Sequence, residues 1–324
     1  MNALNRVVVW CAAVLVTGCG AMSMPDAGSA GGGGAAGGTA GASGGGMAGG
    51  TAGGVAGGAA GGSAGGSAGG TAGGQASTTL RSGTITLTQS SFMVAGMTIS
   101  SGSISGSFTS VSGPAGANPC VESTVSNCTT TVCDFAMGGG ADAGTTSTLD
   151  SAGMLSVAGT RVDGGVTLAP GAMGAYSRTF MSQLWGGGET LTVAATGAAV
   201  PAFSQTVAAP TDLNVTAPAC PLSSCPAINK TMPLVVSWTG GGTSTVVVNV
   251  SVNDTAANRL GTFFCTFPAS AGTGMIPASV LGVVPAGTGV ITIQPTNTTR
   301  FMAGSYQVTL TASGSGVLGS VTVQ

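Results

Sequence analysis

Apolar and polar residues alternate along most of the second half of the chain, which predicts β-strands. Seven runs show this period of two, and Gly, Pro, Asn or Ser residues separate them at intervals typical of a β-sandwich. The runs are "DLNVT" (212–216), "LVVSWT" (234–239), "STVVVNVSV" (244–252), "GTFFCTF" (261–267), "GVITIQ" (289–294), "SYQVTLTA" (305–312) and "GSVTV" (319–323). The segment "IPASVL" (276–281) does not alternate and predicts a helical turn.

Residue parity within these runs assigns the core-facing side of each strand. Residues two apart in a strand share a face, so alternate apolar residues are expected to enter the core together. The expected core positions are Leu234, Val236 and Trp238; Val246, Val248, Val250 and Val252; Phe263, Cys265 and Phe267; and Tyr306, Val308 and Leu310. Two inner faces of this kind predict a β-sandwich over residues 209–324.

Shorter β-rich runs, separated by Gly-rich turns, fill residues 77–208. The first of them are "GTITLTQSSFMVAGMTIS" (83–100) and "GSISGSFTSV" (102–111). We therefore expect an all-β fold class, with two β-sandwich (Ig-like) domains: a sandwich-like one over 77–208 and a clearer Ig-like one over 209–324.

The segment "AGSYQVTL" (303–310) resembles the tyrosine corner of immunoglobulin-like domains, where a Tyr precedes a core residue of a late strand by two positions. Val308 stands where an immunoglobulin domain has its second cysteine. The resemblance implies an Ig-like sandwich without the disulfide between its sheets. The alternative is an ordinary strand that begins with Tyr306.

A short apolar run, "VVVWCAAVLV" (7–16), follows Arg6 near the start of the chain. A transmembrane helix needs about 20 apolar residues, so this run instead predicts a secretory signal peptide over residues 1–18. The adjoining "VTGC" (16–19) resembles the lipobox of bacterial lipoproteins. That resemblance implies a diacylglyceryl group on the Cys19 thiol, cleavage before Cys19, and acylation of the new amino terminus, with palmitate as the expected acyl group.

Gly20, rather than an aspartate, follows the candidate lipidated cysteine. Within the lipoprotein resemblance this implies export to the outer membrane, at its periplasmic face or at the cell surface. A plain secreted protein is the alternative.

Residues 19–76 are expected to form a lipidated N-terminus and a disordered tether. Residues 27–74 are almost entirely Gly, Ala, Ser and Thr, without a charged or aromatic residue. Such a segment cannot bury enough apolar surface to offset its ordering entropy. As a random coil it would span about 35–42 Å. A phosphate-binding loop is the alternative, but the strand, helix and lysine that such a loop needs are not evident in this segment.

The chemistry of the chain argues against nucleic-acid binding and catalysis. Only 5% of residues are charged, with seven Lys and Arg and no histidine among the 324 residues. Clustered basic residues for phosphate contacts and Ser-His or Cys-His pairs are therefore missing. Paired carboxylates such as Glu122 and Glu189 leave glycoside hydrolysis formally open. We expect no enzyme and no cofactor.

Six cysteines remain after the predicted cleavage: Cys120, Cys128, Cys133, Cys220, Cys225 and Cys265. Their spacing does not suit zinc, and an exported compartment permits disulfides. The closeness of Cys220 and Cys225 predicts a local bridge, and the other four are further disulfide candidates. Cys265 faces the expected core, so a free buried thiol is the alternative for it.

Three aspartates in Gly-rich turns, Asp142, Asp150 and Asp163, raise the question of calcium. A calcium loop usually presents several oxygen ligands at alternate positions, whereas these residues are dispersed. We interpret them as turn formers and expect no metal.

The chain resembles lipoproteins of myxobacteria over nearly its whole length. The shared features are the lipobox, the Gly-Ala tether, "GGGETLTVAATGAAVPAF" leading into "VAAP", and an ending with "WTGGG", "FFCTFPASAGTGMIPASVL" and "AGSYQVTL". The resemblance implies a location and an architecture but no activity.

Two functions follow as expectations. The first is a lipid-anchored binding or adhesion protein for a protein or glycan; the second is a structural envelope or coat protein without a discrete ligand. An exposed apolar patch would favour binding, and a uniform Ser/Thr surface would favour coating.

Overall fold

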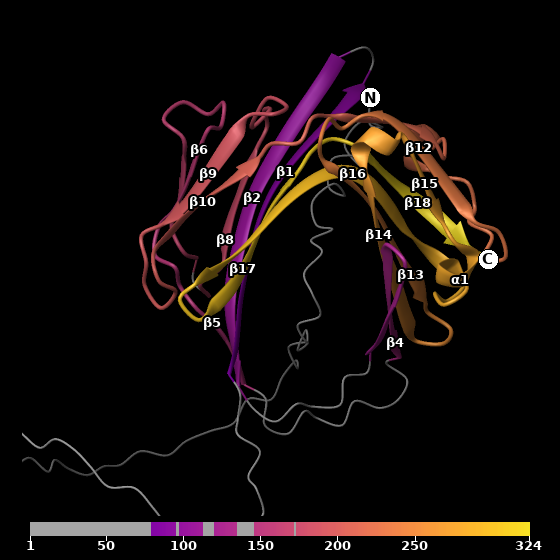
Figure 1. Cartoon of the computed structure of the whole chain (residues 1–324), viewed down its shortest axis with the longest axis horizontal. Helices are drawn as coiled ribbons and strands as arrows, with labels where there is room; N and C mark the ends of the chain where they lie inside the picture. The colour runs from indigo at the N-terminus through magenta and orange to yellow at the C-terminus, as the bar shows by residue number, and fades with distance from the viewer. Residues whose placement is uncertain (1–78, 95–96, 113–119, 135–145, 172) are drawn as a thin grey trace, which may run out of the picture. The chain divides into compact units, whose positions relative to one another are not determined.

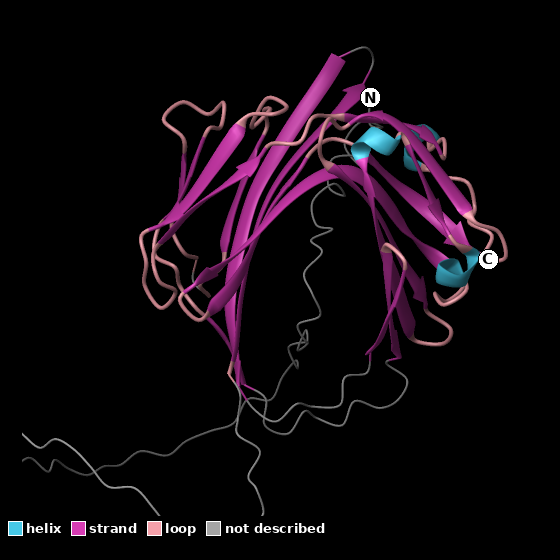
Figure 2. Ribbon diagram, in the orientation of Figure 1, coloured by secondary structure: helices cyan, strands magenta, loops and turns pink. Residues whose placement is uncertain are grey.

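A computed structural model describes residues 79–94, 97–112, 120–134, 146–171 and 173–324. The regular structure of these residues is nearly all β-strand, which confirms the predicted all-β class (Figure 2). The predicted signal peptide, Cys19 and the Gly-Ala tract lie outside the described residues. No helix in the described part of the chain is long and apolar enough to cross a membrane.

Ten strands precede residue 209. They are β1 (Leu80–Val94), β2 (Met97–Ser112), β3 (Cys120–Val125), β4 (Cys128–Asp134), β5 (Thr146–Leu149), β6 (Leu155–Ala158), β7 (Val166–Leu168), β8 (Tyr176–Phe180), β9 (Thr190–Ala195) and β10 (Phe203–Ala208).

Eight strands follow, and seven of them match the seven predicted runs. They are β11 (Leu213–Ala217), β12 (Leu234–Gly240), β13 (Thr245–Asp254), β14 (Arg259–Pro268), β15 (Thr273–Ile276), β16 (Gly287–Ala303), β17 (Tyr306–Ser313) and β18 (Val317–Val323). The additional strand, β15, is too short to show an alternating pattern. The predicted helical turn is α1 (Ala278–Leu281), and two 3₁₀ turns cover Pro221–Ser223 and Ala269–Ala271.

The strands form one large sheet and two small ones (Figure 1). The large sheet has eleven strands in the order β3-β4-β14-β13-β16-β17-β1-β2-β5, with β18 also paired to β16 and β8 to β2. The small sheets are β10-β9-β6-β7 and β11-β12-β15. Each small sheet covers a different part of the large one, which makes the arrangement sandwich-like.

Two separate hydrophobic clusters lie between these layers. The first core joins the four-stranded sheet to β17, β1 and β2, through side chains such as Leu191, Val193, Ile85 and Leu87. The second core joins the three-stranded sheet to β13, β14, β16 and β18. Both cores therefore rest on the same large sheet.

Parity correctly assigned the core-facing positions, but it did not identify which core they enter. Tyr306, Val308 and Leu310 are buried as expected, yet they belong to the first core because β17 pairs in parallel with β1. Cys128 of β4 conversely packs in the second core. Two segments thus cross the predicted boundary between 77–208 and 209–324. Independent folding of these two ranges stays a prediction.

β17 can join the first core because β16, which has 17 residues, is long enough to reach both cores. Residues 288–296 of this strand pair with β13, and residues 296–303 pair with β17. One strand therefore passes from the second core to the first and carries β17 with it. Alternation specifies which face of a strand is apolar but not which neighbour it meets.

The tyrosine-corner prediction is wrong. A corner requires the tyrosine hydroxyl to bond to the backbone a few residues upstream. The Tyr306 hydroxyl instead donates to the carboxylate of Asp150, at 2.8 Å. Because β17 has joined the first core, the partner comes from a segment distant in sequence.

Candidate functional site

The large sheet is polar on the face that turns away from the first core. Ser and Thr side chains occupy alternate positions of five neighbouring strands, and the strand register aligns them in rows. We call these rows the hydroxyl face. Two complete rows are Thr298-Thr311-Thr86-Ser105-Ser177 and Thr296-Ser313-Thr88-Ser103-Thr179, and a shorter row is Arg300-Thr309-Thr84-Ser107. Thr296 and Ser313, at one end of the second row, are buried and bond to each other, so the accessible hydroxyls are those of the other members.

The local sequence explains why these hydroxyls line up. In "TITLT" (84–88) the Ile and Leu enter the first core, so the three threonines share the opposite face. The same alternation in β2 and β17 places hydroxyls beside them. Adjacent strands lie about 4.8 Å apart, and residues two apart in a strand lie about 6.7 Å apart. The result is a regular grid of hydroxyl groups.

Part of the grid is bonded internally. The hydroxyls of Thr88 and Ser103 lie 2.6 Å apart, and those of Thr298 and Thr311 lie 3.4 Å apart. A hydroxyl can donate one hydrogen bond and accept two, so each such pair keeps capacity for an outside partner. Arg300 is the one charged residue in the rows. This surface is suited to polar, uncharged ligands and not to acid–base chemistry.

A second polar cluster, around Asp150, lies on the core-facing side of the large sheet, at the edge of the first core. The carboxylate accepts hydrogen bonds from the hydroxyls of Ser110 and Tyr306. The guanidinium of Arg81 lies 5.7 Å from the centre of the Tyr306 ring. Burial raises the pKa of Tyr306, the hydrogen bond between Tyr306 and Ser110 opposes that shift, and the nearby Asp150 adds to it. The phenol therefore stays protonated at neutral pH.

These contacts bear on the aspartates singled out in the sequence. Asp150 has hydroxyl partners, Asp163 is exposed in a turn, and Asp142 lies outside the described residues. Within the described ranges no group of three His, Cys, Asp or Glu side chains could hold a metal ion.

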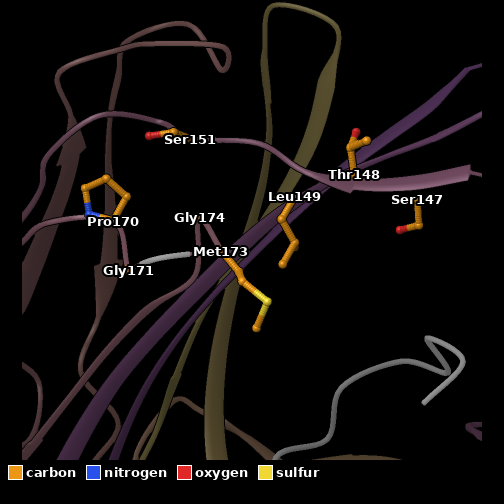
Figure 3. Close-up of a pocket in the computed structure, with 8 residues that line it drawn as sticks. All are labelled: Ser147, Thr148, Leu149, Ser151, Pro170, Gly171, Met173 and Gly174. Carbon is orange, nitrogen blue, oxygen red and sulfur yellow. The ribbon is translucent and has the colours of Figure 1, made fainter. Parts of the chain in front are cut away.

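A pocket of about 620 Å³ opens beside β5 (Figure 3). Its lining comes from β5, from the segment that follows β5 and from the segment between β7 and β8, namely Ser147, Thr148, Leu149, Ser151, Pro170, Gly171, Met173 and Gly174. The side chains of Leu149 and Met173 extend to the same side (Figure 3). The lining contains no titratable side chain, so this pocket offers no catalytic group.

Glu122 and Glu189, the two glutamates considered for catalysis, belong to different parts of the described fold. Glu122 lies on β3, the edge strand of the large sheet. Glu189 closes the turn before β9, where its carboxylate accepts from the backbone N–H of Gly186 at 2.6 Å and lies 3.8 Å from Arg161. Glu189 thus has a local structural role.

The six described cysteines form three disulfides. Cys220 and Cys225 are bridged, as predicted, with an S–S distance of 2.03 Å. The others are Cys120–Cys133, across β3 and β4, and Cys128–Cys265, across β4 and β14. The alternative of a free Cys265 thiol is therefore wrong, because β4 arrives from the first half of the chain and supplies its partner.

Exposed large apolar side chains occur mainly in small groups. Val235 and Met275 face each other across β12 and β15, and Leu80 faces Val111 across β1 and β2.

Comparison with known proteins adds no candidate: no protein-family model and no curated protein matches the sequence. The hydroxyl face remains the candidate surface, and the repeated T-x-T and S-x-S spacing was the sequence signal for it.

Proposed function

We propose that this protein is a lipid-anchored, non-enzymatic cell-envelope protein that displays β-sandwich domains for binding or adhesion to a protein or glycan. The observation that supports a binding role is the hydroxyl face. Its groups both donate and accept hydrogen bonds, as sugar hydroxyls do, and its regular spacing offers repeated contacts to a repeating polymer. A glycan is the ligand that this chemistry favours.

The same face suggests that each contact is weak. Sugar-binding surfaces gain much of their affinity from aromatic rings, and the rows contain none. Many copies on one surface would then bind through avidity. The tether and the proposed lipid at Cys19 would supply this multiplicity by holding many copies at one membrane.

Binding is tested with two matched double variants of the full chain. Thr86→Val with Thr311→Val removes two adjacent hydroxyls from the central row while keeping side-chain shape. Thr216→Val with Thr239→Val makes the same change on β11 and β12, away from the face. We expect the first pair to lower retention on surface polysaccharide at least threefold and the second to leave it unchanged. Equal retention by all three proteins would contradict the proposal.

The anchor is tested separately. Cys19→Ala is expected to abolish lipid labelling and to release the protein from the membrane fraction. A variant that still sediments with membranes in detergent-free buffer would contradict the lipoprotein assignment without affecting the binding test.

A coat without a discrete ligand is the second candidate. The small size of the exposed apolar groups favours it, because binding surfaces for proteins usually contain larger patches. A protein that forms an even layer on cells yet retains no polysaccharide or protein would support this candidate.

A further inference from the structure

Strand β3 is an exposed edge of the large sheet. It pairs only with β4 among the described strands, and residues 121–125 are all exposed. Val121 is 72% exposed and Val125 is 37% exposed, so the strand contributes little to either core. An open edge of this kind is a template for pairing with another strand.

The chain nevertheless holds this strand firmly. The disulfide Cys120–Cys133 ties β3 to β4, and the disulfide between Cys128 and Cys265 ties β4 to β14. The hydroxyls of Ser123 and Thr130 lie 2.6 Å apart across the same pair of strands. A strand that buries almost nothing is thus fixed in position, as an edge prepared for a partner would be.

The backbone of β3 determines which groups face outward. β3 and β4 are joined by the two-residue turn Ser126–Asn127, so the flanking Val125 and Cys128 form a hydrogen-bonded pair. Along an antiparallel ladder, hydrogen-bonded pairs alternate with pairs that have no backbone hydrogen bonds to each other, and Glu122 and Thr124 belong to the second kind. The backbone N–H and C=O groups of Glu122 and Thr124 therefore point away from β4, toward the open edge.

Natural edge strands usually carry Lys, Pro or several charges that block such pairing. In β3 the one charged residue is Glu122, and the remaining exposed positions are Val, Ser and Thr. Val121, Ser123 and Val125 lie on one face of the strand, and Glu122 and Thr124 lie on the other.

We propose that β3 pairs with β3 of a second copy of this chain, antiparallel and centred on Ser123. In this register Val121 lies opposite Val125 of the other copy, and Glu122 lies opposite Thr124. The outward N–H and C=O groups of Glu122 and Thr124 bond to each other across the two-fold axis. A register centred on Glu122 would place two carboxylates opposite each other, which is unfavourable.

The self-complementarity of this register is the argument for a second copy as the occupant. Every exposed valine meets a valine, and the single charge of each strand meets a hydroxyl. The result is an isologous dimer in which the two large sheets become continuous. This dimer would present two hydroxyl faces in one assembly.

The register is tested by cross-linking the full chain. Ser123 of the two copies would form a pair without backbone hydrogen bonds, with Cα atoms about 4.5 Å apart. Ser123→Cys is therefore expected to give a disulfide-linked dimer on oxidation, with the three native disulfides intact by mass mapping. Glu122→Cys is the matched control and is expected to cross-link at least tenfold less. Equal cross-linking of the two variants, or none for Ser123→Cys, would overturn the register.

A second pair of variants tests the edge itself without new cysteines. Thr124→Pro removes one outward N–H and spares the bonds to β4, whereas Thr124→Val keeps that N–H. Sedimentation equilibrium of the full chain in detergent is expected to show dimers for the unsubstituted chain and for Thr124→Val. The dimer association constant is expected to fall at least tenfold for Thr124→Pro. A monomeric unsubstituted chain, or dimers unaffected by Thr124→Pro, would overturn the proposal.

Discussion

The two cores rest on one sheet but are stabilised in different ways. The second core is rich in valine, with Val246, Val248, Val250 and Val252 all fully buried on β13. Every described disulfide lies in or beside it. The first core contains no cysteine among its described residues; aromatic rings occur in both cores, and the first core also buries side-chain hydrogen bonds.

The polar bonds of the first core are specific. The Gln89 side-chain oxygen accepts from the backbone N–H groups of Leu184 and Trp185, at 2.9 and 3.0 Å. The Tyr176 hydroxyl accepts from the N–H of Ala152 and donates to the C=O of Gly153. A chain with few charges can thus reinforce one core with covalent links while another relies on noncovalent contacts, buried hydrogen bonds among them.

The largest expected effect comes from the longest disulfide loop. Cys128→Ala with Cys265→Ala removes a bridge between residues 137 apart, and the loop-entropy model predicts a loss of about 2–5 kcal/mol in the free energy of unfolding. Hydrogen exchange is expected to speed up most in β13 and β14. The control, Cys220→Ala with Cys225→Ala, opens a loop of separation 5 and is expected to cost about 2 kcal/mol. Equal acceleration in both cores would remove the contrast between them.

A smaller effect is expected at Gln89 in the first core. Gln89→Met keeps the side-chain volume but leaves two buried backbone N–H groups without an acceptor, which costs about 2–4 kcal/mol. Urea unfolding gives the loss, and hydrogen exchange places it in β9 rather than β13. Gln307→Met is the matched control, because Gln307 is exposed and should tolerate the change. An equal loss of protection in both cores would show that the cores are not separable.

Tyr306 is expected to contribute about 1–2 kcal/mol through its bond to Asp150. Its pKa is raised in the folded protein, so the folded state holds the phenolic proton more tightly than the unfolded state. The contribution is thus complete below the unfolded pKa near 10 and is lost as the pH rises through the folded pKa. The stability difference between the unsubstituted chain and Tyr306→Phe should shrink above pH 10 in urea titrations. A stability difference that grows with pH would contradict the raised pKa of Tyr306.

The smallest effect is expected on the hydroxyl face. Thr86→Val with Thr311→Val should change the free energy of unfolding by less than about 0.5 kcal/mol, because these side chains lie outside both cores. Thermal unfolding of this variant also serves the binding test, since unchanged stability separates lost hydroxyls from lost folding. A loss above about 1 kcal/mol would make the face part of the fold.

The sequence predicted features that depend on a single strand, such as which side chains face a core. It did not predict features that depend on which two strands pair. Alternation alone identified Val246 to Val252 and Phe263 as core positions, because facing is a property of a single strand. It could not reveal that Tyr306 would meet Asp150, since parallel pairing of β17 with β1 depends on the whole topology.

The candidate surface shows the same limit. The threonines of "TITLT" were visible in the sequence, but their rows exist only because four other strands align with them. The bridge from Cys220 to Cys225 was predictable because its loop is short, whereas the partner of Cys265 came from a strand far away in sequence.

The parallel pairing of β1 with β17 also determines when during synthesis the first core can form. Synthesis proceeds from the amino terminus, so Ser82 must wait for Gln307 before its register can form. Until then Ile85 and Leu87 lack the strand that completes their core, and Cys128 lacks Cys265. Such distant contacts slow folding and leave apolar surface open to aggregation in the meantime. A nascent chain of this protein therefore keeps part of both cores exposed until its last strands emerge, when both cores can close almost together.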